Sequence, residues 1–420
     1  MYASKAQSPL KRTALYQLHV DAGAKIVPFG GYDMPLEYKD QSHTESHKWT
    51  REKASLFDVS HMVQHMISGA LAEKFLMKIT PSSINQLSPH TSILSCLLQN
   101  PSGGIVDDTV ITRLGKDSFY FVTNAACRDD DLKFISEELD KFLDSAGATD
   151  DKIDWRTLDQ HSLLALQGPL AAEVLQSSIF VDEDDKDVNT DLSTLYFGNS
   201  RYLQLKLKDE TSTPPLLISR TGYTGEDGFE ISIPGKHGDD SGLATMTAKT
   251  LIADGSTVRW AGLAARDSLR LEAGMCLYGH DISLETTPVS ATLGWIVGKD
   301  RRSKDTADFN GANTILEQLE SPKKMAQRRV GFLVEKGPAA REGAEIVDPE
   351  SGDTIGKITS GLPSPTLGGQ NIAMGLIKNG YHKKGTKVGV KVRKSVRKAE
   401  VAKMPFVENK FYKPDSKGKV

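Results

Sequence analysis

The sequence predicts an α+β protein of several domains, and three observations support this fold class. The chain has 420 residues, of which 38% are hydrophobic and 25% charged, as in folded globular proteins. At about 150 residues per domain, this length suggests roughly three domains. Helix-spaced and strand-spaced apolar residues alternate as far as residue 298, and beyond it short alternating β segments dominate.

The first part of the chain predicts helices and strands in mixed order. The expected elements are helices at 13–22, 41–54, 70–80 and 130–146, a long strand at 56–67, and strands at 92–98, 106–113 and 119–123. Residues 56–155 therefore form a compact α+β unit. We expect this unit to be inserted into a central α+β domain made of residues 1–55 and 156–298.

The remaining elements complete the central domain and build a third one. They are a strand at 163–166, a helix that opens at Pro169, two strands within 202–231, helices at 242–254 and 262–273, and β segments at 330–333, 355–358, 373–376, 387–393 and 399–403. The boundary is expected near 299–305. Residues 299–412 then form a β-rich C-terminal domain, and residues 413–420 a tail.

Charge and cysteine content narrow the class of protein. The net charge is −3, but residues 382–420 carry 13 Lys+Arg against 3 Asp+Glu. This basic stretch could steer an acidic partner or be a solvated strand face. No aromatic ladder accompanies it, so we expect no nucleic acid. The three cysteines form no CxxC pair, which favours a reducing compartment, and no apolar run is long enough to span a membrane.

The first candidate motif is the run from Gly103 to Asp108. Two glycines lead into a strand that starts with paired carboxylates. Neighbouring strand residues point to opposite faces, so only one of Asp107 and Asp108 is expected to enter a given cavity. The alternative is a surface turn with solvated acids.

The second motif runs from Gly222 to Ile231 and contains three glycines spaced by three. A phosphate-binding loop would precede a helix, whereas this run leads into a strand. A tight turn that presents Tyr223 and Glu230 to a cavity fits better, because a carboxylate can accept two hydrogen bonds from a guanidine-like heterocycle edge. The alternative is a plain hairpin turn.

The third motif is the helix at 263–274, which ends at a glycine. Arg266 and Arg270 share a helix face at i, i+4. The alternative is a solvated face with an Asp267–Arg270 ion pair. His43 and His47 have the same spacing and could hold a metal, but they lack HExxH or cysteine support, so we expect packing histidines and no metal.

Taken together in their order, these and further segments resemble the aminomethyltransferases of the glycine cleavage system, the T-protein family, in its eukaryotic mitochondrial form. The resemblance covers nearly the whole chain and rests on the segments 30–35, 56–62, 103–108, 165–169, 222–231, 262–279 and 403–407.

The resemblance implies three domains around a central folate channel, two with ferredoxin-like α+β elements and one C-terminal β-barrel or jelly-roll-like domain. It implies transfer of the aminomethyl group from the lipoyl arm of the H-protein to tetrahydrofolate, giving ammonia and 5,10-methylenetetrahydrofolate. The cofactor is then tetrahydrofolate as co-substrate, without a metal. The partners are the lipoylated H-protein and other glycine cleavage components. The place is the mitochondrial matrix, with a transit peptide already trimmed.

The same matching assigns site residues. Asp107 takes the place of the family's key acid, Glu230 that of the pterin-binding carboxylate and Arg266 that of a folate-site arginine. The expected pocket walls are Tyr223, Trp295, Met62 and Asn124. Asp108 is expected to point away from the site. Where the family often ends in Tyr-Tyr, this chain has Phe411 and Tyr412, so the first hydroxyl contact is missing or is made by Tyr412.

Two other classes are compatible with a folate-binding chain. An iron–sulfur assembly relative would carry a Lys-Gly-Cys-Tyr segment, but the comparable residues here are 272–279, Glu-Ala-Gly-Met-Cys-Leu-Tyr-Gly. A sarcosine or dimethylglycine dehydrogenase would need a flavin domain with GxGxxG, and this sequence contains none after an N-terminal strand.

Overall fold

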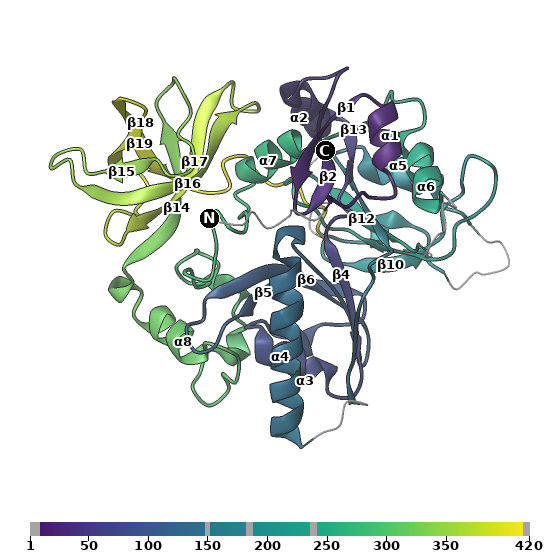
Figure 1. Ribbon diagram of the computed structural model, residues 1–420, viewed down its shortest axis with the longest axis horizontal. Coiled ribbons are helices and arrows are strands. Elements are labelled where there is room, and N and C mark those ends of the chain that lie inside the picture. The colour runs from purple at the N-terminus through teal and green to yellow at the C-terminus, as the bar shows by residue number, and fades with distance from the viewer. Residues whose placement is uncertain (1–8, 148–151, 182–187, 236–241, 415–420) are drawn as a thin grey trace, which may run out of the picture.

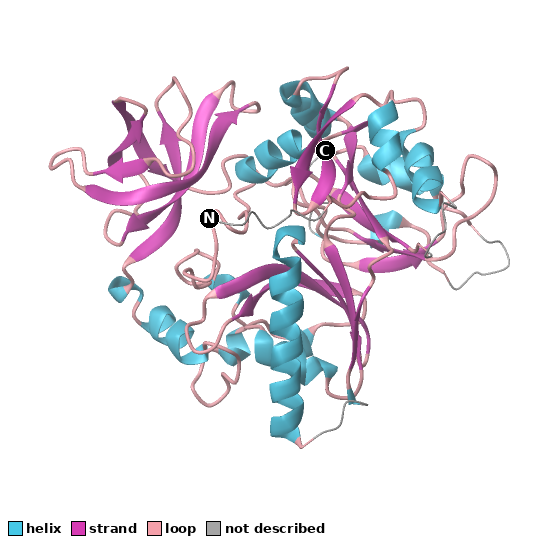
Figure 2. Ribbon diagram, in the orientation of Figure 1, coloured by secondary structure: helices cyan, strands magenta, loops and turns pink. Residues whose placement is uncertain are grey.

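Three sheet-bearing units surround the centre of the molecule in the computed structural model (Figures 1 and 2). The structure describes residues 9–147, 152–181, 188–235 and 242–414. Of the expected tail, 413–420, the part from 415 onward lies outside the described residues. No described helix has the length and apolar character needed to cross a membrane.

The central unit is a six-stranded sheet in the order β10-β11-β12-β9-β3-β13, in which only β13 and β3 run parallel. Its strands are β3 (Ala54–Asp58), β9 (Ser162–Gln167), β10 (Ser200–Leu203), β11 (Leu216–Ser219), β12 (Gly228–Ile233) and β13 (Val258–Trp260). Three strands thus lie within and around 202–231, where the sequence predicted two. The apolar core joins this sheet to helices α5 (Ala171–Ser178) and α6 (Leu243–Ile252).

The second unit is a five-stranded sheet in the order β5-β6-β7-β4-β8. Its elements are β4 (Val63–Ser68), β5 (Thr91–Leu98), β6 (Ile105–Gly115), β7 (Ser118–Thr123), β8 (Asp154–Thr157), α3 (Ala72–Ile79) and α4 (Arg128–Ala146). The two helices bury their apolar faces on the sheet, as Phe75 and Ile135 show. The long helix α4 stands over this sheet in Figure 1.

The single strand expected at 56–67 is wrong, because β3 and β4 belong to different sheets. The chain turns between them: the Met62 amide donates to the Val59 carbonyl at 3.0 Å, and the Ser60 amide donates to the buried Asp58 carboxylate at 2.9 Å. β3 pairs with β9 of the central sheet. We therefore propose that the inserted unit begins after β3, not at residue 56, and extends through β8.

The C-terminal unit is a closed barrel in the order β14-β17-β16-β15-β18-β19. Its strands are β14 (Gln327–Val334), β15 (Glu345–Val347), β16 (Thr354–Ser364), β17 (Gln370–Lys378), β18 (Lys387–Val392) and β19 (Ser395–Ala402). Helix α8 (Ala312–Glu320) packs elsewhere: its Ile315 lies in one cluster with Leu98 and Ile105 of the five-stranded sheet. We therefore propose that the barrel starts at β14, not near residue 299.

The remaining elements join the units. They are α1 (Tyr16–Asp21), the hairpin β1 (Ala24–Phe29) and β2 (Tyr32–Tyr38), α2 (His43–Glu52), α7 (Leu263–Glu272) and short 3₁₀ turns at Ile84–Gln86, Ala125–Cys127, Leu192–Thr194, Gly294–Ile296, Lys299–Arg301 and Pro322–Lys324. The buried Glu272 of α7 accepts from Ser364 of the barrel at 2.5 Å and from Arg51 of α2 at 2.8 Å. This carboxylate links the barrel to the central unit.

Candidate active site

The site is built around the start of β6, where the chain passes close to a neighbouring loop. Gly103 has φ +69°, and a Cβ at Gly104 would lie only 2.1 Å from the Leu284 carbonyl oxygen. Side chains are therefore excluded at Gly104, and the left-handed conformation at Gly103 favours glycine. The two glycines bring β6 into the interior, which rules out the exposed surface turn considered above.

Asp107 is fully buried, and its main hydrogen-bond donor is Asn124. Asn124 donates to its carboxylate twice, from the backbone amide at 2.7 Å and from Nδ2 at 2.8 Å. Burial raises the pKa of Asp107, and the two Asn124 donors act in the opposite direction, because they favour the ionised form. Asn124 follows β7, so the pairing of β6 with β7 places donor and acceptor together.

Asp108 does not point away from the site as strand alternation predicted. The same Asn124 Nδ2 donates to Asp108 Oδ1 at 2.9 Å. The register irregularity lies one residue earlier, where Leu97 faces Asp107 but Leu98 faces Ile105, so Val106 has no direct partner in β5. Asp107 and Asp108 themselves stay in regular register, and the side-chain amide of Asn124 reaches both carboxylates. Burial, and next the charge of Asp107, raise the pKa of Asp108 to about 7.

A second cluster of charged and aromatic side chains surrounds Glu230 of β12. Thr221 donates to Glu230 Oε2 at 2.8 Å. The Arg266 guanidinium lies over the Tyr223 ring, 4.8 Å from its centroid, and the negative charge of Glu230 is close enough to favour its ionised form.

 Burial lowers the pKa of Arg266, and the charge of Glu230 opposes this shift. The turn is therefore not a plain hairpin with solvated acids, because Glu230 is half-buried, accepts from Thr221 and acts on the charge of Arg266.

Tyr223 lies close to members of both clusters, Arg266 and Asp108. Its ring carries Arg266 on one side, its hydroxyl donates to the Cys276 carbonyl, and its pKa is raised by burial and by the charge of Asp108. Arg266 Nη1 is buried and has no hydrogen-bond partner in the described part of the chain. An unpaired buried guanidinium N–H is costly, so a ligand with an acceptor at this position would fit.

The two arginines of α7 have different surroundings. Arg270 forms the expected ion pair with Asp267 at 2.9 Å, but it is buried rather than solvated. It also donates to Asp281 at 2.6 Å and to Ser360 of the barrel at 2.9 Å. Arg270 therefore has a structural role, and Arg266 is the arginine left for a ligand.

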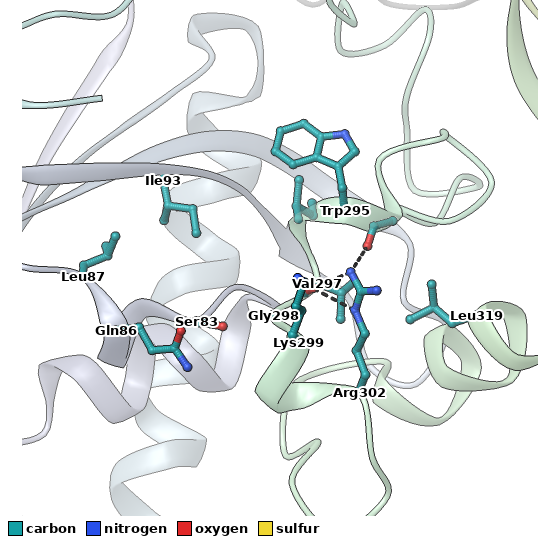
Figure 3. A pocket seen from close by; sticks show the side chains of 12 residues that line it. Ser83, Gln86, Leu87, Ile93, Trp295, Val297, Gly298, Lys299, Arg302 and Leu319 are labelled. Carbon is teal, nitrogen blue, oxygen red and sulfur yellow. Dashed lines mark hydrogen bonds between the residues drawn. The ribbon is translucent and has the colours of Figure 1, made fainter. Parts of the chain in front are cut away.

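Met62 and Trp295 lie in separate places. Met62 packs against the apolar cluster that contains Phe57 and Leu269. Trp295 is 63% exposed and borders a different pocket of about 630 Å³, with Leu87 and Arg302 on its other sides (Figure 3). The contacts of Trp295 in this structure do not join it to Asp107.

The C-terminal aromatic pair packs on the central unit. Phe411 stacks on Phe197 with ring centroids 4.0 Å apart, and Tyr412 stacks on Tyr196 at 5.6 Å. The Tyr412 hydroxyl donates to the Ser193 carbonyl at 3.1 Å. This hydroxyl is therefore already engaged within the protein.

Two buried groups, Asp131 and His61, and the partly buried Tyr278 lie near the clusters and were not selected from the sequence as site residues. Asp131 and Tyr278 lie close to Asp107. His61 packs edge-on against Phe29, and burial lowers its pKa to about 4. The order of residues gives no sign of these positions, since each depends on contacts between distant segments.

No metal centre is formed by the described residues, because none of their His, Cys, Asp and Glu side chains gather in groups of three or more that could hold an ion. The basic strand β18 is partly neutralised within the barrel. Lys391 pairs with Glu345 at 2.7 Å, and Lys387 pairs with Glu400.

The fold and site define a class of three-unit α+β proteins with a closed C-terminal barrel and buried acids at the centre. Residues 15–301 match the family described as GCVT N-terminal domain, and residues 327–408 match the glycine cleavage T-protein C-terminal barrel domain. The chain belongs to the glycine cleavage T-protein family.

Similar proteins agree with this assignment. A probable mitochondrial aminomethyltransferase of Schizosaccharomyces pombe is 46% identical over 98% of this chain and 96% of its own length. A mitochondrial aminomethyltransferase of Saccharomyces cerevisiae is also 46% identical, over 97% and 96%. The crystal structure of the glycine cleavage system aminomethyltransferase T from Bartonella henselae matches with a TM-score of 0.81 and 37% identity, covering 96% of this chain and all of that one.

These matches confirm the resemblance inferred from the sequence, the α+β fold class and the aminomethyltransferase class of enzyme. The third unit is a closed barrel, which decides between the barrel and the jelly-roll form.

Proposed function

We propose that this chain performs the aminomethyl transfer of its family with Asp107 as the acid that faces the reacting folate nitrogen. The lipoyl-bound aminomethyl group and tetrahydrofolate then give 5,10-methylenetetrahydrofolate, ammonia and the dihydrolipoyl carrier. The observation that carries the proposal is the fully buried Asp107 carboxylate, which Asn124 fixes through two hydrogen bonds.

The chemistry explains why such a carboxylate is needed. Tetrahydrofolate supplies its own nitrogen nucleophile, so the protein must position two substrates, exclude water and stabilise a developing iminium charge. Positioning can contribute about 7–11 kcal/mol of barrier reduction in favourable cases. A fixed anion in a dry site stabilises a cation without reorganisation, and the Asn124 contacts fix Asp107 in this way.

We assign the pterin end of the folate to the cluster around Glu230. Thr221 occupies Glu230 Oε2, which leaves Oε1 to accept from the heterocycle edge. Arg266 has an unpaired buried N–H to offer an acceptor. Tyr223 supplies an aromatic wall between Glu230 and Asp107, while Met62 adds an apolar one.

We assign three aromatic residues to the outer edge of the proposed folate site: Trp295, Phe411 and Tyr412. The exposed Trp295 ring is free to cover a ligand that extends out of the interior. The two C-terminal aromatic rings stack on their own neighbours, so a direct contact with folate would require them to move.

The proposed partner is the lipoylated H-protein, together with the other glycine cleavage components. The proposed place of action is the mitochondrial matrix, supported by similar proteins that are named as mitochondrial. The basic stretch in residues 382–420 supports the proposed carrier, because it could steer an acidic partner.

The test is Asp107→Asn, which keeps the shape of the side chain and removes its charge. We expect methylenetetrahydrofolate formation from aminomethylated carrier to fall by at least about 100-fold, within the range of a positioned acid or base, while folate still binds. Asp129→Asn is the matched control, because Asp129 is an exposed acid near the same site. Activity of Asp107→Asn within about threefold of wild type would refute the assignment.

A further inference from the structure

Asp131 is a fully buried acid next to Asp107. It lies in the first turn of α4, whereas its neighbours in that turn, Asp129 and Asp130, are exposed. No partner meets the full distance and angle limits of a hydrogen bond to either Asp131 oxygen among the described residues, but the side chains of Thr123 and Asp107 interact with this carboxyl. An ionised carboxylate buried in this way would be strongly disfavoured.

Helix capping does not account for this burial. A first-turn acid usually serves free backbone N–H groups from the surface of the helix, as Asp129 and Asp130 are placed to do. The N-cap residue, Cys127, makes no side-chain capping bond, and the oxygens of Asp131 receive none either. Asp131 therefore needs another reason to be inside.

The neighbouring groups determine which of the two carboxyls, Asp107 or Asp131, is protonated. Two adjacent buried carboxyls cannot both ionise at low cost. Asn124 supplies two donors to Asp107 and none to Asp131, so the ionised form is favoured at Asp107. The groups that face Asp131 are Asp107 and Asp108 of β6, Thr123 of β7, Cys127 before α4 and Tyr278.

We propose that Asp131 is a positioning residue that keeps one proton beside Asp107, so that the two carboxyls act as a proton-sharing pair with Asp107 as its anion. This inference rests on the proposed role of Asp107. The protonated Asp131 orients the Asp107 carboxylate without adding a second negative charge to the site. Loss of that proton at alkaline pH would place two anions together and disturb the alignment of Asp107.

The direct test is infrared difference spectroscopy of the whole protein during a pH titration. Burial, and then the charge of Asp107, raise the pKa of Asp131 to about 10, whereas that of Asp108 is raised to about 7. At about pH 8.5, between these two values, the protonated carboxyl band should therefore come from Asp131. We expect this band in wild type and in Asp129→Asn, and its loss in Asp131→Asn.

The absence of the band in wild type at this pH, or its persistence in Asp131→Asn, would overturn the inference. Activity gives the second readout, because asparagine mimics the protonated acid but cannot ionise. We expect Asp131→Asn to lose the part of the alkaline decline that wild type and Asp129→Asn share. An unchanged alkaline decline would also overturn it.

The infrared result does not depend on the chemistry assigned to Asp107. If Asp107→Asn stays active while the Asp131 band behaves as expected, the proposed function fails and the proton-sharing pair remains. If Asp107→Asn is inactive while the band is absent from wild type, the proposed function stands and the pair fails.

Discussion

Replacing Glu230 by glutamine should weaken folate binding more than it slows the chemical step. Glu230 projects from β12, and Thr221 already occupies its Oε2, so one oxygen is left for the ligand. Glutamine keeps the shape but converts a charge-assisted hydrogen bond into a neutral one. A hydrogen bond to a charged group contributes about 1.5–3 kcal/mol and a neutral one about 0.5–1.5 kcal/mol, so the loss of roughly 1–1.5 kcal/mol corresponds to a dissociation constant larger by roughly 5- to 13-fold.

The measurement is a titration of tetrahydrofolate into the full-length protein, followed by turnover at saturating folate. Glu173→Gln is the matched control, since Glu173 is an exposed acid on α5 of the same unit. Turnover at saturation should change far less than the dissociation constant, because Glu230 is assigned to the pterin end and not to the reacting nitrogens. An unchanged folate dissociation constant would remove Glu230 from the pterin site.

Two further predictions concern the links between units and the carrier surface. Glu272→Gln should lower the free energy of unfolding at pH 7 by about 3–5 kcal/mol, because it breaks a buried pair with Arg51. Burial raises the pKa of Glu272, but hydrogen bonding to His47 outweighs it and lowers this pKa from 4.5 to about 2. The stabilisation by the Glu272 carboxylate is therefore present above pH 4.5 and is lost towards pH 2. Thermal unfolding across this pH range checks both statements, and equal stability of the two proteins at pH 7 would contradict the role of Glu272 as a link between the units. If the basic stretch steers an acidic partner, reversing Lys391 and Arg393 to glutamate should raise the Michaelis constant for the carrier at about 0.02 M salt and much less at about 0.2 M. A Michaelis constant that does not change in these kinetic assays would show that the stretch is only a solvated strand face.

Ion pairs within the barrel give the last experiment a useful control. Lys391 is already paired with Glu345, so reversing Lys391 also removes an intramolecular contact. Glu345→Gln removes the same contact while leaving the positive charge of Lys391 in place. If Glu345→Gln raises the Michaelis constant as much as the reversal does, loss of the pair, and not loss of steering, accounts for the effect.

The amino-acid pattern alone predicts those elements whose buried face shows in their periodicity. Helix α4, helix α7 and five of the six barrel strands overlap the expected ranges, because their apolar spacing reflects one buried face. The short strand β15 was not expected. The ordered motifs also pointed to the family before any contact was known. The placement of Asp107 inside the protein followed from matching alone.

Contacts between distant segments, which the amino-acid pattern does not show, determine what packs against each buried face of a helix or strand. The apolar pattern at 56–67 is continuous in the sequence, yet it splits into β3 and β4 because two different sheets bury the two halves. Asp108 joins Asp107 because the side-chain amide of Asn124, which follows β7, donates to both carboxylates. In the sequence, Asp131 cannot be told apart from an ordinary first-turn acid, and only the structure shows that it is buried beside Asp107 of β6. Periodicity reports that a face is buried, whereas charge and proton placement depend on the distant segment that buries it.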